Sequence, residues 1–393
     1  MLKAYKYRLY PNKEQEVLLN KHFGCVRFVY NYSLNLKITA YQNENTRLSK
    51  FDLDKQLTEL KKLDEYNWLK EVNSQSLQAS NRHLDVAFSN FFKQHNDFPK
   101  FKSKKTNRFS FEIPSNIILD VDNNKVSFPK FKEGVNLVIS RIPKGIIRQA
   151  TVSKTPSNKY FISILYETGI DNKQKETITR ENTIGIDLGI KDFVITSDGV
   201  KYENNKYLRK LEDKLAKEQV KLSIKVKGSN NRNKQRIKVA RVHEKISNQR
   251  LDYLHKISSI LVSENKTICI EDLNVQGMVK NHKLAKSISD VSWSKFVELL
   301  RYKAEWYGVN ILQIGRFEPS SKMCSCGVIN KEITLKDRKW TCGTCGLIHD
   351  RDILASNNIK NFSLNAIGLG QPESTPIESK SLDPRGNRNP IGL

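Results

Sequence analysis

Thr183-Ile-Gly-Ile-Asp-Leu-Gly-Ile190 is the stretch of the chain that decides its fold class. Apolar residues alternate there with two glycines and one carboxylate, which predicts a strand with Gly185, Asp187 and Gly189 on one face. Glycines beside a carboxylate would let a phosphate or a metal approach the backbone. A second run, Thr267-Ile-Cys-Ile-Glu-Asp-Leu273, also places an acid on an apolar strand. A carboxylate in such a strand is costly unless its charge is compensated.

Strands and helices alternate around these two runs, which indicates an α/β layer. Asp352 lies at the start of the last predicted helix, so it can join Asp187 and Glu271. The expected elements are a strand hairpin over 183–200, charged helices to about residue 264, strands at 267–273 and 309–317, and helices at 293–307 and 353–362.

Three converging carboxylates, Asp187, Glu271 and Asp352, form the ligand set that metal-dependent cleavage of a phosphodiester needs. Two Mg²⁺ ions about 4 Å apart can activate a water molecule and stabilise the leaving oxygen. Any one of these acids alone is better explained as a strand-end or helix-cap residue. Their shared local pattern favours a functional site.

Other acids near these runs leave alternatives open. Asp350 could cap the last helix or replace Asp352 as the ligand. Asp198 precedes a glycine and indicates a turn. Asp272 should face away from its neighbour Glu271 in a regular strand. Asp192 also lies close by.

Cysteines occur in two close pairs, Cys324-Ser-Cys326 and Cys342-Gly-Thr-Cys345. The spacing is typical of a zinc ribbon, in which four thiolates close a tetrahedral structural site. His349 could substitute as a ligand, although four cysteines suffice. The remaining two cysteines, Cys25 and Cys269, lie in apolar runs and are expected to be buried and unreactive.

A strong positive charge indicates a polyanionic partner. The chain of 393 residues has 67 Lys and Arg against 42 Asp and Glu, a formal net charge of +25. The basic residues are spread along the chain, which favours nucleic acid over a membrane surface. The sequence has no run of roughly 18 to 20 apolar residues and no apolar signal core at its N-terminus, so we expect a cytoplasmic protein.

Two segments concentrate this charge. Residues 98–108 interleave aromatic rings with lysines, the composition of a loop that grips a nucleic-acid backbone. Residues 221–250 contain ten Lys and Arg and one acid, and a helix so unbalanced would repel itself unless it lay against phosphates. The candidate contacts are Lys102, Lys104, Lys105, Arg232, Lys234, Arg236 and Arg241.

The N-terminal half has a different pattern. Residues 1–10 alternate as a strand, and helical periodicity follows over 14–41 and 50–92, opened by an Asn12–Gln15 capping box. Short alternating segments over 109–168 predict a small β-barrel or sandwich. The first strand can belong to this sheet, with the helical module inserted between.

The chain resembles the TnpB family, transposon-encoded RNA-guided DNA endonucleases related to the type V CRISPR nucleases. The resemblance spans nearly the whole length. It is carried by the opening Tyr-Lys-Tyr-Arg-Leu-Tyr-Pro-Asn-Lys-Glu-Gln (5–15), Phe-Gly-Cys-Val-Arg-Phe-Val-Tyr-Asn (23–31), Gly-Ile-Asp-Leu-Gly-Ile (185–190), Ile-Glu-Asp-Leu (270–273), Pro-Ser-Ser-Lys-Met-Cys-Ser-Cys-Gly (319–327) and Asp-Arg-Asp-Ile-Leu-Ala-Ser-Asn-Asn-Ile (350–359).

The resemblance implies a RuvC-type, RNase-H-like nuclease domain with catalytic Asp187, Glu271 and Asp352, Mg²⁺ or Mn²⁺ at that site, and structural Zn²⁺ on the ribbon. It implies a guide RNA from the transposon end as a partner, and double-stranded target DNA cleaved beside a short flanking motif. Gln75 and Gln78 are candidates for reading that motif. A monomer in the ribonucleoprotein is favoured, associated with the nucleoid of a prokaryotic host.

The implied domains are a wedge β-barrel with an inserted helical recognition module, followed by the nuclease domain with its inserted ribbon. A disordered tail is expected from the polar, proline-rich composition of the C-terminus. The ranges are 1–10 and 96–180 for the barrel, 11–95 for the module, 181–319 and 348–362 for the nuclease, 320–347 for the ribbon, and 363–393 for the tail.

Two departures from the family pattern concern the site. Leu354 stands where the family usually has asparagine, and the first cysteine pair is one residue short. Neither removes a carboxylate or a thiolate. The competing hypotheses are an RNA-guided DNA-binding repressor without cleavage, a strand-transferring transposase, and a zinc-ribbon transcription factor, which would leave the acidic strands unexplained.

Overall fold

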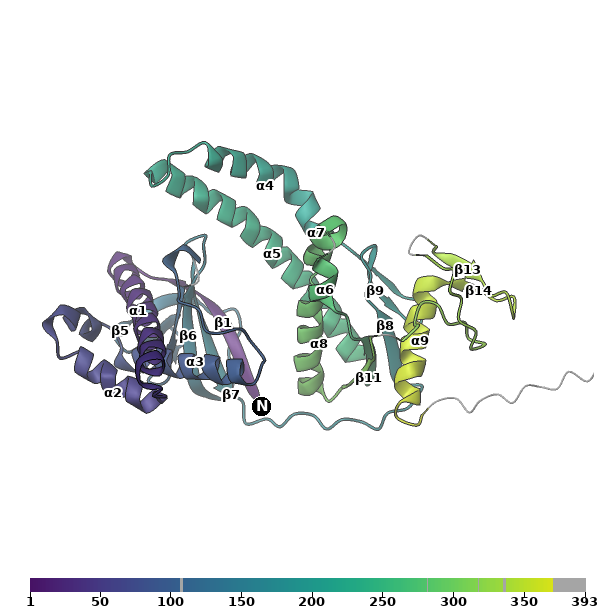
Figure 1. Cartoon of the computed structure of the whole chain (residues 1–393), viewed down its shortest axis with the longest axis horizontal. Coiled ribbons are helices and arrows are strands. Elements are labelled where there is room, and N and C mark those ends of the chain that lie inside the picture. The colour runs from purple at the N-terminus through teal and green to yellow at the C-terminus, as the bar shows by residue number, and fades with distance from the viewer. Residues whose placement is uncertain (107–108, 281, 317, 335–336, 370–393) are drawn as a thin grey trace, which may run out of the picture. The chain divides into compact units, whose positions relative to one another are not determined.

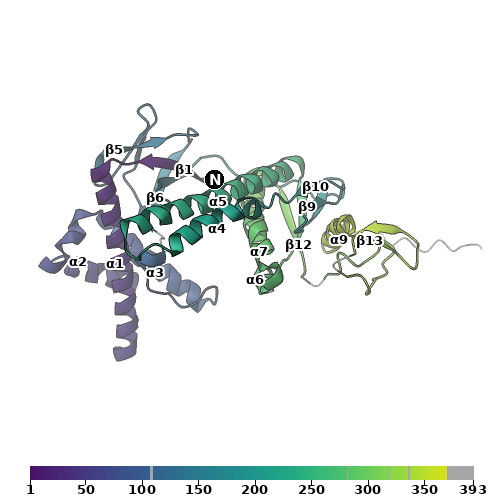
Figure 2. The same cartoon turned by 90° about the horizontal axis from the view of Figure 1, so that it is seen from above.

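The computed structural model describes residues 1–106, 109–280, 282–316, 318–334 and 337–369 (Figures 1 and 2). The chain forms two compact units. The first contains residues 1–171 and 209–248, and the second contains residues 172–208 and the chain from residue 249 onward. Each unit is described by itself.

A seven-stranded antiparallel sheet forms the centre of the first unit, in the order β2-β6-β7-β1-β5-β4-β3. The N-terminal strand lies between β7 and β5, which confirms that it belongs to the sheet formed much later in the chain. Side chains of β7 alternate between buried and half-buried, as period-two patterning requires. The bounds are β1 Leu2–Tyr10, β2 Phe109–Ile113, β3 Ile118–Asp120, β4 Lys125–Phe128, β5 Phe131–Val138, β6 Ile146–Lys154 and β7 Tyr160–Glu167.

Helices α1 (Lys13–Glu44), α2 (Lys50–Leu60) and α3 (Ser74–Phe92) lie between β1 and β2 in the chain. The predicted capping box opens α1: the Gln15 amide donates to Asn12 Oδ1 at 2.8 Å, and the Asn12 amide donates to Gln15 Oε1 at 3.1 Å. The single helical stretch expected over 50–92 was wrong. It is divided into α2, a 3₁₀ segment over Asp64–Glu71, and α3.

A tertiary contact marks the start of α3. The Asn73 side chain caps the helix, and the Asn73 amide donates to Nε2 of His22 at 3.1 Å. His22 is fully buried in α1, and its Nδ1 bonds the Leu18 carbonyl at 2.8 Å. Burial lowers the pKa of His22 to about 4, so the ring is neutral and accepts the amide proton. The helical periodicity of the sequence did not show this break because a distant residue stabilises it.

Two long helices, α4 (Tyr207–Ser223) and α5 (Asn230–Glu264), come directly after β10 (Lys201–Glu203) in the chain (Figure 1). The turn between them is closed by Arg232, whose Nη1 donates to the carbonyl oxygens of Leu222 and Lys225 at 2.7 and 2.8 Å. Helix α5 begins in the first unit and ends in the second.

The second unit is built on a five-stranded sheet in the order β10-β9-β8-β11-β12. Strands β8 to β10 form an antiparallel meander, whereas β11 runs parallel to both β8 and β12. The bounds are β8 Thr183–Asp187, β9 Asp192–Thr196, β10 Lys201–Glu203, β11 Thr267–Glu271 and β12 Asn310–Ile314.

Helices cover both faces of this sheet. Ile184, Ile186, Ile268 and Ile270 pack with the C-terminal half of α5 and with α8 (Trp293–Tyr307). On the opposite face Cys269 packs with residues of β12 and α9 (Arg351–Asn365). The α/β layer expected from the alternation of elements is confirmed, and α8 has the predicted bounds.

Smaller elements and boundaries differ from expectation. Helices α6 (Val275–Val279) and α7 (His282–Val291) were not predicted. A two-stranded ribbon pairs β13 (Lys339–Thr341) with β14 (Ile348–Asp350). Helix α9 continues to Asn365, so the tail expected from residue 363 begins too early, and residues 370–393 lie outside the described part. No helix in the described residues combines the length and apolarity needed to cross a membrane.

Candidate functional site

Two of the predicted acids end neighbouring parallel strands. Asp187 is the last residue of β8, and Glu271 is the last residue of β11. The register pairs Cys269 with Gly185, and continuing it by two residues on each strand places Glu271 beside Asp187. Adjacent strands lie about 4.8 Å apart, and residues two apart share a face, so both carboxylates emerge at one edge of the sheet.

Helix α9 brings the third acid to this edge. It contacts β8 more extensively than any other strand, and a Cβ added at Gly185 would lie 2.0 Å from the carbonyl oxygen of Ser356. The expectation that Gly185 leaves room for a phosphate or metal is therefore wrong, because the space is filled by the helix backbone. Gly189 is constrained similarly by the Asp192 carbonyl oxygen, 2.5 Å from a built Cβ.

The pKa values of Asp187 and Glu271 show that the three acids interact electrostatically. Burial raises the pKa of Asp187 to about 6, and the charge of Asp352 adds to the increase. Burial also raises the pKa of Glu271 to about 7, with further contributions from Asp187 and Asp272. Crowded carboxylates in a poorly solvated place resist ionisation unless a positive charge compensates them. A divalent cation would supply that charge, so the residues fit a metal.

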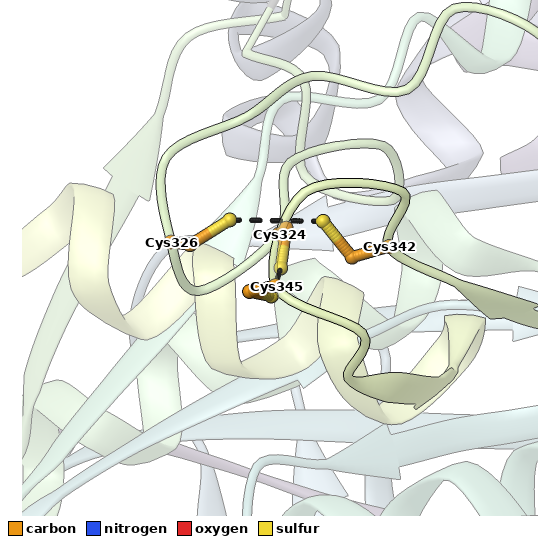
Figure 3. A group of neighbouring side chains, drawn as sticks. All are labelled: Cys324, Cys326, Cys342 and Cys345. Atoms are coloured by element: carbon orange, nitrogen blue, oxygen red, sulfur yellow. Dashed lines mark hydrogen bonds between the residues drawn. The ribbon is translucent and has the colours of Figure 1, made fainter. Parts of the chain in front are cut away.

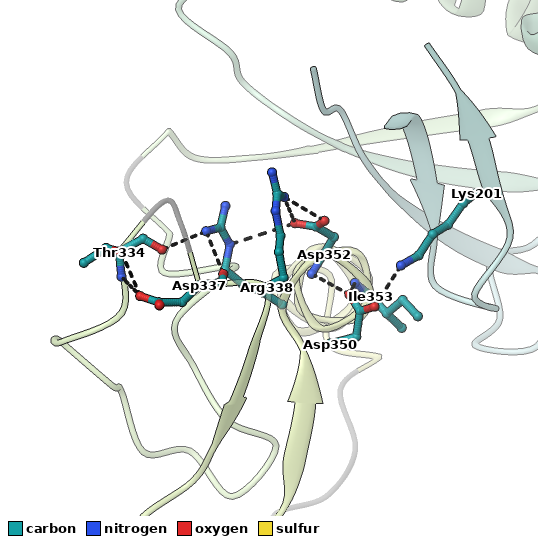
Figure 4. A network of polar contacts seen from close by, with 8 residues as sticks. Lys201, Thr334, Asp337, Arg338, Asp350, Asp352 and Ile353 are labelled. Carbon is teal, nitrogen blue, oxygen red and sulfur yellow. Dashed lines mark hydrogen bonds and ion pairs between the residues drawn. The ribbon is translucent and has the colours of Figure 1, made fainter. Parts of the chain in front are cut away.

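A guanidinium supplies part of that charge in the structure (Figure 4). Nη1 of Arg338 lies 3.1 and 3.0 Å from the two carboxylate oxygens of the buried Asp352. Within the described residues, the carboxylates do not form a group whose oxygens all lie within 4.8 Å of one another; only the cysteines form such a ligand group.

The neighbouring acids have other partners. Asp350 caps α9 by accepting the amides of Asp352 and Ile353 at 3.1 and 3.3 Å, and it pairs with Lys201 at 2.8 Å (Figure 4). Burial opposes its ionisation, but the Lys201 bond and these amides outweigh burial and lower the pKa of Asp350. The cap alternative left open for this residue is confirmed.

The other three acids are not members of the predicted set, although the charge of Asp272 acts on Glu271. Asp272 pairs with Arg316 at 2.8 Å. Asp198 accepts the Thr196 hydroxyl in the turn after β9, and Asp192 opens β9.

The four cysteines converge on one point (Figure 3). Their sulfur atoms all lie within 4.8 Å of one another, with Cys324–Cys345 at 3.5 Å and Cys326–Cys342 at 3.7 Å. A tetrahedral ion with Zn–S bonds of about 2.3 Å places its sulfurs about 3.8 Å apart. Backbone amides of Cys345 and Thr344 lower the pKa of Cys342 to about 6, whereas at Cys345 a backbone amide is outweighed by desolvation and the neighbouring thiols, which raise the pKa of that thiol to about 12. Without a metal ion the close sulfurs therefore do not all ionise near neutral pH, and a bound cation would supply the charge that four thiolates need. The site fits a four-thiolate metal ion.

A small apolar cluster joins this site to α9. Leu354 packs with Cys324, Cys342, Ile333 and Trp340. The departure from the family asparagine therefore has a structural account: the leucine faces the ribbon and is buried by it. Nε2 of His349 lies 3.0 Å from the sulfur of Cys324, but His349 is not a member of the four-cysteine ligand group.

The two remaining cysteines are buried, as expected. Burial raises the pKa of both Cys25 and Cys269 to about 11, so neither is a reactive thiolate at neutral pH.

The candidate nucleic-acid contacts fall into two groups. Gln75 and Gln78 are exposed on one face of α3, and Gln75 accepts a hydrogen bond from Ser115 at 2.8 Å. Lys102 places its ammonium 3.7 Å over the Tyr30 ring. Arg232 serves the α4–α5 turn, so its first role is structural. The exposed or half-exposed candidates are Lys104, Lys105, Lys234, Arg236 and Arg241.

Sequence reasoning missed Arg338 and Lys201. Arg338 stands in Lys-Asp-Arg-Lys-Trp, a polar stretch between the cysteine pairs with no periodicity to mark it. Lys201 follows a turn glycine by two residues. Only the chain path shows that each meets an acid at the start of α9.

Three family descriptions match the chain. "Probable transposase" covers residues 163–282, "Helix-turn-helix domain" covers residues 1–46, and "Cas12f1-like, TNB domain" covers residues 293–359. The second description does not fit the structure, in which residues 1–46 contain strand β1 and the single helix α1.

Two relatives extend over nearly the whole chain. A protein of Streptomyces pristinaespiralis named "Putative RNA-guided DNA endonuclease" is 40% identical over 399 residues, covering 100% of this chain and 98% of the relative. An Escherichia coli K12 protein with the same description is 32% identical, covering 91% of each chain. A cryo-EM structure of a Cas12f1–sgRNA–target DNA complex matches in fold, with a TM-score of 0.55, 12% identity, and coverage of 92% of this chain and 99% of that one.

The chain has a mixed α/β fold similar to that of Cas12f1, and it matches the Cas12f1-like TNB domain over residues 293–359. With a relative 40% identical over its full length, the chain belongs to the TnpB family.

Proposed function

We propose that the chain is an RNA-guided, divalent-metal-dependent DNA endonuclease of a transposon, which hydrolyses target DNA beside a short flanking motif. The observation that carries the proposal is the meeting of Asp187, Glu271 and Asp352 at one sheet edge, with the pKa values of the first two raised by burial and by the neighbouring acids. The names of the two extensive relatives support the same activity.

The mixed sheet supports an RNase-H-like, RuvC-type core. An antiparallel meander continues into parallel strands, and two acids end the adjacent strands β8 and β11. Asp187, Glu271 and Asp352 would hold Mg²⁺ or Mn²⁺. Such ions activate a water molecule and stabilise the leaving oxygen when bound. The three side chains would orient the metals, and the Asp350 cap would fix the first turn of α9 that carries Asp352.

The four cysteines would hold structural zinc. Through Leu354 the ribbon packs on the helix that carries Asp352, so the zinc would stabilise the position of a catalytic ligand. The Asn358 amide strengthens this link by donating to the Ser320 and Met323 carbonyls, each at 2.7 Å. The segment around the first cysteine pair is thus tied to α9 twice.

The N-terminal unit would serve as the wedge barrel and recognition module that hold the guide RNA. Gln75 and Gln78 would read the flanking motif from α3. Exposed basic residues on α5 and the loop around Lys104 would contact phosphates. Base pairing with the guide would select the target sequence in double-stranded DNA. A single chain per ribonucleoprotein, in the cytoplasm at the nucleoid, completes the proposal.

The test begins with the protein purified from cells that carry its native locus. We expect one abundant RNA from the edge of the element to copurify, and the complex to cut matching double-stranded DNA in Mg²⁺. Asp187→Ala should reduce the cleavage rate at least about a thousandfold, because a metal ligand is lost. Asp198→Ala, which removes an acid from a turn outside the cluster, is the matched control and should cleave normally.

Other outcomes would favour the rival functions. Specific RNA and DNA binding without cleavage by the unaltered protein would indicate a guided repressor. Joining of transposon-end DNA without RNA would indicate a strand-transferring transposase. Elemental analysis should give about one zinc ion per chain, lost in Cys342→Ser.

A further inference from the structure

The contact between Arg338 and Asp352 is the starting observation (Figure 4). A single nitrogen, Nη1 of Arg338, faces both carboxylate oxygens at 3.1 and 3.0 Å. A cation bound by both oxygens of a carboxylate approaches it from the same side, between the oxygens. The guanidinium therefore stands where a metal ion would approach Asp352.

The backbone on which Arg338 sits is held firmly. The Arg351 amide donates to the Arg338 carbonyl at 2.8 Å, and the next residue, Lys339, pairs with Asp350 in the ribbon. The Arg351 side chain donates to the carbonyls of Thr334 and Asp337 at 2.9 and 3.2 Å. Displacing Arg338 from Asp352 thus requires only rotation of its side chain.

The two partners differ in their freedom to move. The Asp352 side chain is 12% exposed, whereas the Arg338 side chain is 49% exposed. The guanidinium of Arg338 can move into solvent and be hydrated there, whereas the buried carboxylate of Asp352 is poorly accessible to water. The positive charge of Arg338 also acts on Asp187. Arg351 shares this role, because its Nε lies 3.9 Å from Asp352 Oδ1 and its charge also acts on Asp187. Its side chain is nevertheless held by the carbonyls of Thr334 and Asp337, so Arg338 is the cation that can move into solvent.

We propose that Arg338 is a built-in competitor of the metal ion: it neutralises Asp352 while the site is metal-free and is displaced when a divalent cation binds. The inference rests on the proposed metal site. It gives the ribbon segment between the cysteine pairs a second role besides zinc binding, because this segment carries the competing charge. The site would then remain folded without metal, at the cost of a weaker metal affinity.

Binding of Mn²⁺ tests the proposal independently of cleavage. The full-length chain is freed of Mn²⁺ and Mg²⁺ by gel filtration, and free Mn²⁺ is measured by electron paramagnetic resonance during a titration. Asp352→Asn defines the background from other sites. We expect Arg338→Gln to lower the Kd of the Asp352-dependent site by roughly threefold to thirtyfold, because a cation is removed from beside the ion.

Two variants serve as controls. Arg338→Lys keeps the charge and should bind Mn²⁺ within about twofold of the unaltered protein. Arg148→Gln breaks another half-exposed ion pair, with Glu167 in the first unit, and should leave the Kd unchanged. An Arg338→Gln protein that binds Mn²⁺ equally or more weakly would overturn the competition, even if the unaltered protein cleaves DNA.

A second experiment uses the unaltered chain, so its result does not depend on whether a variant folds. Phenylglyoxal modifies exposed guanidinium groups, and peptide mass spectrometry follows each arginine. Saturating Mn²⁺ should accelerate modification of Arg338 and leave Arg148 unaffected; an unchanged Arg338 rate would contradict the proposal. If no Asp352-dependent Mn²⁺ site exists, both this inference and the proposed metal-dependent function fail. If such a site exists but its Mn²⁺ affinity does not change in Arg338→Gln, only this inference fails.

Discussion

At the scale of single residues, the site is dominated by carboxylates placed where ionisation is unfavourable. Asp187 and Glu271 end strands that are buried on both faces. Burial raises the pKa of both, with a further increase from Asp352 at Asp187 and from Asp187 at Glu271. Arg338 pairs with Asp352, and its positive charge lowers the pKa of Asp187 against these effects. The ionised carboxylates therefore lower the stability of the folded protein, and such perturbed groups are common at functional sites.

Asp187→Asn should therefore stabilise the protein in a buffer without added Mg²⁺ or Mn²⁺. The pKa of Asp187 in the folded state, about 6, lies above its ordinary value of 3.8. The contribution of this residue to the unfolding free energy is therefore most favourable below pH 3.8, and it is lost as the pH rises through 6. At pH 8 the asparagine variant should gain about 1–3 kcal/mol in unfolding free energy, and the gain should vanish near pH 4. Urea denaturation from pH 4 to 8 measures it.

The comparison variant for that measurement is Asp198→Asn, which removes a turn carboxylate hydrogen-bonded by Thr196. It should show no gain that grows with pH. If Asp187→Asn were no more stable than the unaltered chain at pH 8, Asp187 would not bear the electrostatic cost assigned to it.

At the scale of elements, the fit of α9 against β8 places Asp352 near the strand acids. Gly185 allows this contact, since a Cβ there would lie 2.0 Å from the Ser356 carbonyl oxygen and 2.9 Å from the Lys360 amide. The ribbon adds a second support through Leu354, and Asp350 caps the helix. Three independent contacts thus determine where α9 begins and which way it runs.

Gly185→Ala should push α9 away from the sheet. We expect a loss of about 1–3 kcal/mol or more in unfolding free energy, because backbone atoms cannot yield as a flexible side chain would. Mn²⁺ affinity should fall with it, since Asp352 moves with the helix. Thermal unfolding and Mn²⁺ titration measure the two effects.

Gly24→Ala is the matched substitution, because a Cβ at Gly24 in α1 meets nothing within 4 Å. Alanine favours a helix over glycine, so this variant should be slightly more stable, by up to about 1 kcal/mol. Equal behaviour of the two variants would show that α9 does not depend on the absence of a side chain at residue 185.

At the scale of the whole molecule, the formal charge of +25 would attract a polyanionic partner before any specific contact forms. The excess is concentrated in α5, where Lys234 and Arg241 are exposed and Arg236 is half-exposed. Phosphate contacts release counterions, so each contact contributes to the salt dependence of binding.

Replacing Lys234, Arg236 and Arg241 with glutamine should weaken RNA binding and lower the slope of log K against log salt concentration by about two to three. Filter binding of the copurified RNA from 50 to 400 mM salt gives this slope. The charge-conserving variant Lys234→Arg, Arg236→Lys, Arg241→Lys should keep it. An unchanged slope in the glutamine variant would place the phosphate contacts elsewhere.

Local sequence signals were enough to predict the α/β layer, the strands of the N-terminal half and the residue types of both candidate centres. These signals are period-two patterning, cysteine spacing and acids on apolar runs. Tertiary structure decided the rest. The pairing of Cys269 with Gly185 aligned two acids that lie 84 positions apart in the sequence. His22 stabilised a helix break at Asn73, and Arg338 reached Asp352 from a stretch without a pattern. Such contacts join distant segments, so no local periodicity records them.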